Sequence, residues 1–216
     1  PADMCFKLPD NMTTEEGALV EPLAVGLHAT GLGNAGLGDE ILILGGGCIG
    51  LVTLLSAKAR GASKIVVVDL YEKRLAMAKK MGASAVIQAG TEDVGARIKE
   101  IFGGKGADIV FETAGAISTI QQTPYFVKKG GTIVLVGMAA ESMAEFNFSQ
   151  AMKKEIIIKT VFRYRNLYPT AIAAVSSGSI DVKQIVTHRF TFDETDKAFR
   201  TVVEDAQNVI KGVIQF

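Results

Sequence analysis

Short apolar runs alternate along this chain with segments in which apolar residues recur every three or four positions. The runs predict six buried strands, at Ile41–Leu44, Ile65–Val68, Ala85–Ile87, Ile109–Phe111, Thr132–Val136 and Ile156–Ile158, the last extending towards Phe162. Helical spacing predicts helices between the first four of them, over Ile49–Ala59, Tyr71–Met81 and Val94–Phe102. Strands apolar on both faces that alternate with helices are typical of a parallel sheet covered on both sides. The pattern therefore predicts an α/β fold with a doubly wound, six-stranded parallel sheet.

Further elements flank this core. Thr13 and Glu16 have the spacing of a capping box, which predicts a helix that continues through Leu23 and beyond. Pro22 lacks an N–H group and restricts the backbone of Glu21, so we expect the helix to kink or break there. The tail predicts a helix over Tyr168–Ser176, a strand over Ile185–Arg189, a helix over Glu194–Glu204 and a strand over Val209–Ile214.

Composition excludes several classes of protein. The 216 residues are 48% hydrophobic and carry 23 basic and 23 acidic side chains, without the basic runs typical of nucleic-acid binding. The longest apolar run, Ile41–Leu55, is short and contains four glycines, so we expect no membrane span, and no signal peptide is visible. Two cysteines and two histidines, none grouped at metal-site spacing, predict neither a disulfide framework nor a metal site. A cytoplasmic location is the expectation.

Three glycines, Gly45, Gly47 and Gly50, lie between the first predicted strand and the helix after it. In that position the G-x-G-x-x-G spacing gives a tight turn, a close approach to a pyrophosphate and close packing of helix on strand. Asp69 ends the second strand, nineteen residues after Gly50, where a carboxylate accepts ribose hydroxyls and repels a 2′-phosphate. These residues predict a Rossmann-type site that prefers NAD to NADP. The alternative is that the glycines only end a strand and Asp69 only begins a loop.

Three other positions each have two interpretations that the residues alone leave open. Arg74, next to Lys73, either lies at the adenosine end of a cofactor, where it could also receive a 2′-phosphate, or is a solvated cation at a helix start. Glu21 is either a buried acid that needs a partner or an exposed acid on a bent helix. The segment 162–166, Phe-Arg-Tyr-Arg-Asn, either reaches a ligand from the end of the sixth strand or forms a basic surface loop.

Taken together with other segments, these motifs resemble the medium-chain, zinc-dependent alcohol and polyol dehydrogenases, and within them the sorbitol (xylitol, L-iditol) dehydrogenases. The matching segments run nearly the full length of the chain: residues 8–10, 16–26, 45–50, 68–69, 136–137, 161–164 and 186–190. Two of them, Glu21-Pro22-Leu23 and Phe162-Arg163-Tyr164, are the ones that separate polyol members from ordinary alcohol dehydrogenases.

The resemblance implies a role for each matching position. The cofactor-binding residues would be Gly45, Gly47, Ile49 and Gly50 at the pyrophosphate, Asp69 at the adenosine ribose, Arg74 at the adenosine end, and Val136, Gly137 and Met138 beside the nicotinamide, with Phe162 and Arg163 closing over it. The catalytic residues would be Glu21, approaching the zinc or its bound water, and Arg163 and Tyr164, contacting polyol hydroxyls.

Members of this family also carry an N-terminal catalytic domain with a Cys, a His and a Glu on zinc, which this sequence does not supply. The resemblance therefore implies that residues 1–20 lead from a missing catalytic domain, that residues 21–166 form the NAD-binding domain, and that residues 167–216 would complete the catalytic domain. Zinc would belong only to the intact protein. A homo-oligomer is also implied, through an edge formed by the alternating segment Ala144–Phe148.

The expected function is the NAD-binding portion of an oxidoreductase that oxidises a secondary hydroxyl of a polyol to a ketone. We expect this chain alone to bind NAD without turnover. Two alternatives remain at this point. One is a non-catalytic nucleotide-binding module. The other is a methyltransferase dependent on S-adenosylmethionine, whose first strand also ends in glycines and whose second strand also ends in an acidic residue. The sixth strand, followed by Phe162-Arg163-Tyr164, argues against the methyltransferase.

Overall fold

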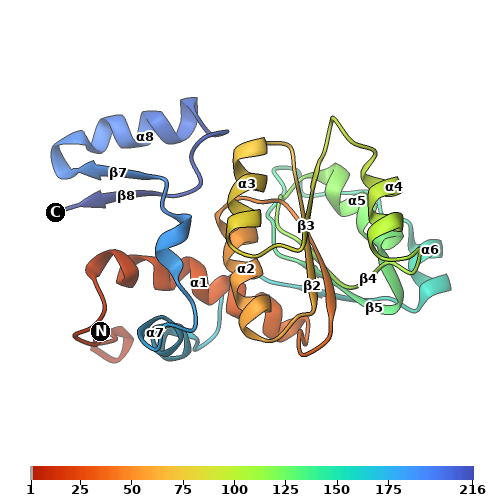
Figure 1. Cartoon of the computed structure of the whole chain (residues 1–216), viewed down its shortest axis with the longest axis horizontal. Helices are drawn as coiled ribbons and strands as arrows, with labels where there is room; N and C mark the ends of the chain where they lie inside the picture. The colour runs from red at the N-terminus through yellow and green to blue at the C-terminus, as the bar shows by residue number, and fades with distance from the viewer. Residues whose placement is uncertain (1) are drawn as a thin grey trace.

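The computed structural model describes residues 2–216 and contains a six-stranded parallel sheet with helices on both faces (Figure 1). The strands are β1 (Glu40–Leu44), β2 (Lys64–Asp69), β3 (Ala85–Gln88), β4 (Ala107–Glu112), β5 (Val127–Leu135) and β6 (Ile157–Thr160). The helices between them are α2 (Cys48–Ala59), α3 (Glu72–Lys80), α4 (Val94–Ile101), α5 (Ile117–Phe126) and α6 (Phe148–Lys154). The strand order β3-β2-β1-β4-β5-β6 is that of a Rossmann fold, so the predicted fold class is confirmed.

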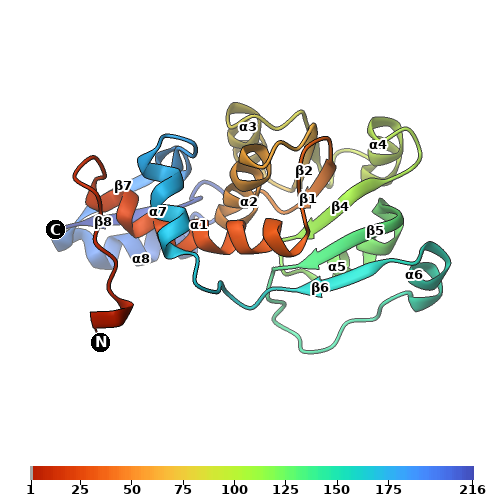
Figure 2. The ribbon, with the colours of Figure 1, turned by 90° about the horizontal axis from the view of Figure 1, so that it is seen from below.

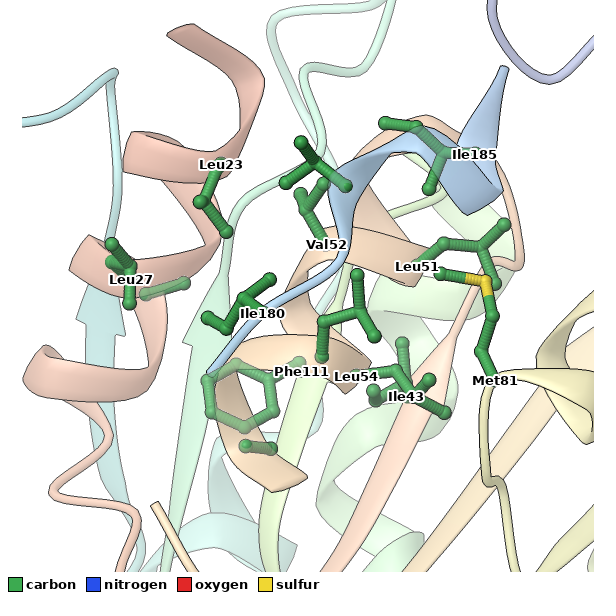
Figure 3. Packing of buried hydrophobic residues seen from close by; sticks show 14 of the residues in the cluster. Leu23, Leu27, Ile43, Leu51, Val52, Leu54, Met81, Phe111, Ile180 and Ile185 are labelled. Atoms are coloured by element: carbon green, nitrogen blue, oxygen red, sulfur yellow. The ribbon is translucent and has the colours of Figure 1, made fainter. Parts of the chain in front are cut away.

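Alternate residues of the central strands enter two separate hydrophobic clusters, one on each face of the sheet. Ile41 and Ile43 of β1 belong to the cluster that α2 and α3 cover, while Leu42 and Leu44 belong to the cluster that α4 and α5 cover. Figure 3 shows the first cluster, where leucines of α2 meet Phe111 of β4. The sheet is thus buried on both faces, as the apolar runs predict.

Helix α1 (Thr14–Leu32) lies between the sheet and the C-terminal part of the chain (Figure 2). Its capping box is present: Glu16 N donates to Thr13 Oγ1 (3.2 Å), and Thr13 N donates to Glu16 Oε2 (2.8 Å). The predicted break at Pro22 is wrong, because the helix runs on for ten residues beyond it. Pro22 is buried together with Leu23, and this packing stabilises the helix despite the missing N–H group.

The tail forms a small body beside α1, at the end of the molecule where both termini lie (Figures 1 and 2). Its elements are α7 (Tyr168–Ser176), a 3₁₀ turn (Val182–Ile185), β7 (His188–Thr191), a second 3₁₀ turn (Phe192–Glu194), α8 (Thr195–Glu204) and β8 (Gly212–Gln215). Strands β7 and β8 pair in parallel. Arg189 donates to both carboxylate oxygens of Glu15 at 2.7 and 2.8 Å, which ties this body to the first turn of α1.

Several boundaries differ from the sequence-based expectation. The strand expected over Ile185–Arg189 begins three residues later, after a 3₁₀ turn, and the strand expected from Val209 begins at Gly212. Helices α5 and α6 were not predicted; α5 carries an internal proline and a polar middle, and α6 is only seven residues long. The expected edge segment is also wrong as a strand, because residues 144–147 are irregular and Phe148 begins α6. Strand β6 is the edge of the sheet there.

In the part of the chain that the structure describes, no helix is both long and apolar enough to cross a membrane.

Candidate dinucleotide-binding site

The turns that follow the central strands lie at one edge of the sheet and are joined by backbone hydrogen bonds. The bonds run from Gly45 N to Val68 O, from Thr113 N to Leu44 O, from Val136 N to Glu112 O and from Val161 N to Leu135 O, each 2.8 Å long. They fix the turns after β1, β4, β5 and β6 relative to one another. Ligands of open parallel sheets bind at this carboxyl edge, where the strand order reverses.

The turn after β1 needs glycine at two positions. Gly45 has φ +106°, and a Cβ there would lie 2.8 Å from Ala114 N. A Cβ on Gly50, in the first turn of α2, would lie 1.8 Å from Gly45 O. The Thr113 hydroxyl closes the turn from β4, because it donates towards Leu44 O and Gly45 O at 3.0 Å each. The first and third glycines of the motif are therefore structural requirements of the turn.

The middle glycine of the motif leaves the N-terminus of α2 open. Gly47 is the N-cap residue and supplies no side-chain hydrogen bond, so the first N–H groups of α2 have no side-chain cap. The nearest atom to a Cβ on Gly47 would be Arg74 Nη1, 3.8 Å away. The space that a side chain would occupy is therefore free. Uncapped N–H groups at the positive end of this twelve-residue helix are suited to donate hydrogen bonds to a pyrophosphate.

Asp69 lies at the end of β2, next to this turn, and is 8% exposed. Its Oδ2 accepts a hydrogen bond from Gly46 N (2.7 Å), and its Oδ1 accepts one from Tyr71 N (2.9 Å). These two backbone donors fix the orientation of the carboxylate. Each carboxylate oxygen has a further lone pair, so the group can still accept hydrogen bonds from a ribose.

Arg74, in the first turn of α3, connects Asp69 with the tail. Its Nη1 lies 3.7 Å from Asp69 Oδ2, and its Nη2 donates to Ala206 O at 2.7 Å, in the turn after α8. The guanidinium carbon lies 4.8 Å from the centroid of the Tyr71 ring. The side chain is only 22% exposed, and its Nε is buried without a partner among the described residues.

The turns after β4 and β5 are in direct backbone contact. A Cβ on Gly137 would lie 2.2 Å from Gly115 N, and a Cβ on Gly115 would lie 2.6 Å from Met138 O. Val136 is buried, while Met138 is 76% exposed. Of the residues predicted to line the nicotinamide side, the structure therefore brings Gly137 and Met138 against the turn after β4.

The segment after β6 contains a cation–π pair and contributes one member of a tyrosine pair. Phe162 is exposed, and the guanidinium carbon of Arg163 lies 5.1 Å from its ring centroid. The Tyr164 and Tyr168 hydroxyl oxygens are 3.1 Å apart. Burial raises the pKa of Tyr168 to about 12, with further contributions from the hydrogen bond to Tyr164 and from the charge of Glu21. No hydrogen bond from Arg163 or Tyr164 to the glycine turn is present among residues 2–216.

Glu21 is exposed on α1, and its carboxylate has no hydrogen bond or ion pair within the described part of the chain. The interpretation as a buried acid is therefore wrong. Burial raises the pKa of the Cys48 thiol, and the charge of Glu21 raises it further. The charge of Glu21 also raises the pKa of Tyr168, so its electrostatic effect reaches the first residues of both α2 and α7.

The side chains that could ligate a metal are dispersed. Among the side chains that the structure describes, no group of three or more His, Cys, Asp or Glu residues is close enough to hold a metal ion. Burial and the charge of Arg165 lower the pKa of His28. His188 stacks on Phe190, with 6.2 Å between the ring centroids. The residues that the structure describes therefore do not fit a zinc site by themselves.

Several site residues were missed in the sequence. Glu112 and Thr113 directly follow a predicted strand, so the rule that ligands bind at strand carboxyl ends could have found them. Lys211 is a second residue that was not predicted. Its charge lowers the pKa of the Cys48 thiol, which opposes the larger increase caused by burial. The carbonyl of Ala206 is a third. Neither tail position has a signal in the sequence, because both depend on how the tail packs.

This fold and this site are those of a dinucleotide-binding domain. The chain belongs to the zinc-binding dehydrogenase family, whose sequence pattern matches residues 48–177. It is 50% identical over 215 residues to the uncharacterised zinc-type alcohol dehydrogenase-like protein YdjJ of Escherichia coli K12, covering all of this chain and 61% of YdjJ. It is 45% identical over 203 residues to the sorbitol dehydrogenase of Rattus norvegicus, covering 93% of this chain and 56% of that enzyme. The chain thus spans less than two thirds of these relatives.

Solved structures similar to this chain include one complex with NADH and one with NADP. An alcohol dehydrogenase from Escherichia coli CFT073 in complex with NADH has a TM-score of 0.94 at 25% identity, covering 100% of this chain and 64% of that one. A zinc-binding dehydrogenase from Sinorhizobium meliloti 1021 bound to NADP has a TM-score of 0.90 at 26% identity, covering 99% of this chain and 63% of that one. Proteins similar to this chain have thus been solved with NADH in one case and with NADP in the other.

Proposed function

We propose that this chain is the NAD-binding portion of a polyol dehydrogenase, and that it prefers NAD to NADP. The observation that carries the proposal is the open cradle at Gly47, with the Asp69 carboxylate beside it. The uncapped N–H groups of α2 would receive the pyrophosphate, with Ile49 contributing its backbone while its side chain packs on the core. Asp69 would accept the adenosine ribose hydroxyls and repel a 2′-phosphate. Calorimetric titration with each cofactor tests the preference.

The remaining predicted positions divide between the two ends of the cofactor. Arg74, held between Tyr71 and the Ala206 carbonyl, would contact the adenosine end. Val136, Gly137 and Met138 would line the nicotinamide side, with the exposed Phe162 and Arg163 closing over it. Bound there, the nicotinamide ring would accept a hydride from the substrate carbon.

The intact protein, in this proposal, oxidises a secondary hydroxyl of a polyol to a ketone. The 45% identity to a sorbitol dehydrogenase supports the substrate class. Glu21 would approach the reacting hydroxyl from α1, and Arg163 and Tyr164 would contact other hydroxyls of the polyol. We assign residues 21–166 to the cofactor domain, and residues 1–20 and 167–216 to elements that belong with a catalytic domain. In support, Glu15 at the start of α1 binds Arg189 of the tail.

A first prediction concerns turnover. Oxidation of an alcohol requires the hydroxyl proton to leave, and in this family zinc assists that step. The described side chains include no group able to hold the metal, so the 216-residue chain should bind NAD but oxidise neither sorbitol nor xylitol, with or without added zinc. The assay follows NADH absorbance with each polyol. Turnover that a chelator abolishes and zinc restores would contradict the prediction.

A second prediction concerns assembly. We propose that two copies associate at the β6 end of the sheet, because Phe148, Ile157 and Ile158 are 67%, 51% and 40% exposed there. An edge strand with apolar side chains favours pairing with another copy. Light scattering at high micromolar concentration should give the mass of a dimer. Phe148→Asp should shift the mass towards a monomer, whereas Phe199→Asp, at an equally exposed position on α8, should not. A wild-type monomer at this concentration would refute the proposal.

A further inference from the structure

Glu112, the last residue of β4, is a fully buried acid with no assigned role. Its exposed fraction is 0%, and its Oε2 has no hydrogen-bond partner among the described residues. Burying a carboxyl group with an unpaired oxygen costs free energy, so such a group calls for an explanation. Burial raises the pKa of Glu112, and hydrogen bonds from Thr119 and from the backbone partly offset that effect.

The other oxygen of Glu112 organises the turn after β4. Its Oε1 accepts three hydrogen bonds: from Ala114 N (3.0 Å), from Gly115 N (2.9 Å) and from Thr119 Oγ1 (2.8 Å). One oxygen atom thus receives donors from Ala114 in the turn, from Gly115 with φ +66°, and from Thr119 in the first part of α5. This side chain determines the conformation of the turn.

The same residue also holds the turn after β5. The backbone carbonyl of Glu112 accepts hydrogen bonds from Val136 N (2.8 Å) and Gly137 N (3.0 Å). The unpaired Oε2 faces that turn as well, since a Cβ on Gly137 would lie 2.8 Å from it. Glu112 therefore accepts five hydrogen bonds, four from backbone groups of the two turns and one from the Thr119 hydroxyl of α5. No charged side chain is among the groups bonded to it.

We propose that Glu112 is a positioning residue that holds the turn after β4 against the turn after β5, and so shapes the wall that receives the nicotinamide end of the cofactor. The inference depends on the proposed function, because Val136, Gly137 and Met138 form that wall. Because Glu112 is fully buried, it would act on the cofactor only through these two turns. Its loss should alter the nicotinamide end of the site and leave the adenosine end, around Asp69, as it is.

The test compares NADH with ADP-ribose, which has the adenosine half but lacks the nicotinamide ring. In wild type, binding should enhance NADH fluorescence, and NAD should bind more tightly than ADP-ribose. In Glu112→Leu the fluorescence enhancement should disappear and NAD affinity should fall about tenfold, as expected for loss of a few buried hydrogen bonds. ADP-ribose affinity should stay within about twofold, since its contacts lie elsewhere. Thr123→Val, which removes a buried hydroxyl from the same helix α5, should change none of these values.

Glu112→Gln supplies a readout that a purely steric role would not change. Since the folded state raises the pKa of Glu112, it holds the proton more tightly than the unfolded chain. The stabilisation from this tightly held proton is fully present at pH values below the ordinary pKa of a glutamate side chain. It is lost as the pH rises through the raised pKa of Glu112. Glu112→Gln, which keeps an acceptor at Oε1 but cannot titrate, should retain most of the fluorescence enhancement and flatten the dependence of the melting temperature on pH.

Each outcome decides between the alternatives. If Glu112→Leu keeps the NADH signal, or weakens ADP-ribose as much as NAD, the positioning role is refuted. If Glu112→Leu does not fold, Thr119→Val removes one of the three donors to Oε1 and should lower the NADH signal while ADP-ribose binding stays the same; an unchanged signal would again refute the role. If wild type binds neither NADH nor ADP-ribose, the proposed function is refuted together with this inference.

Discussion

Gly50→Ala should abolish NAD binding and destabilise the domain by more than about 2 kcal/mol, the range of substitutions that overpack a buried backbone contact. The added methyl group would lie 1.8 Å from the carbonyl oxygen of Gly45, and that oxygen also accepts a hydrogen bond from Thr113. The turn therefore has to open, and the cradle at α2 is lost with it. Urea unfolding measures the stability, and calorimetric titration with NAD measures the binding.

Gly47→Ala is the matched control for the same motif. Its methyl group would have 3.8 Å to its nearest neighbour, and φ of −72° suits alanine, so stability should stay within about 0.5 kcal/mol of wild type. NAD affinity should still fall by about tenfold or more, because the methyl group would occupy the space of the pyrophosphate. Equal NAD affinity in wild type and Gly47→Ala would show that the phosphates bind elsewhere.

Asp69→Ser should abolish the preference for NAD over NADP, a change of about tenfold to a hundredfold in the ratio of the two affinities. The carboxylate is 8% exposed and fixed by Gly46 N and Tyr71 N, so a 2′-phosphate would meet an oriented negative charge with little screening. Affinities for both cofactors, measured by calorimetry at one salt concentration, give the ratio.

The matched control removes a neighbouring charge. Glu72→Ser, on the exposed surface of α3 three residues further along, should leave the ratio unchanged. Equal affinities of wild type for the two cofactors, or a ratio that Asp69→Ser does not alter, would contradict the role of this carboxylate.

The parallel sheet could be predicted because its strands are buried on both faces. Runs such as Ile41–Leu44 leave no polar position for solvent, and their residues enter two clusters on opposite sides. The capping box at Thr13 also formed as predicted, since it depends on residues three positions apart. By contrast, Pro22 did not end α1, because tertiary packing outweighed a local preference. Helix α5 was missed for a similar reason: its sequence is polar and contains a proline.

At the site, too, local motifs could be predicted from the sequence, whereas contacts between distant segments could not. The glycine turn and Asp69 are local motifs, and the structure brings them into contact at 2.7 Å between Gly46 N and Asp69 Oδ2. The contact between Arg74 and the Ala206 carbonyl joins residues 132 positions apart and has no signature in the sequence. Glu112 was missed because its importance lies in three donors that converge on one oxygen. That arrangement depends on how the turns after β4 and β5 pack.

The central claim is that the N-terminus of α2 binds the pyrophosphate of NAD. It is tested most directly by calorimetric titration of the 216-residue wild-type chain and of Gly47→Ala with NAD, after unfolding curves have shown the two to be equally stable. We expect saturable binding of one NAD per chain in wild type and affinity at least about tenfold weaker in Gly47→Ala. No binding by the folded wild-type chain, or the same affinity in both proteins, would contradict it.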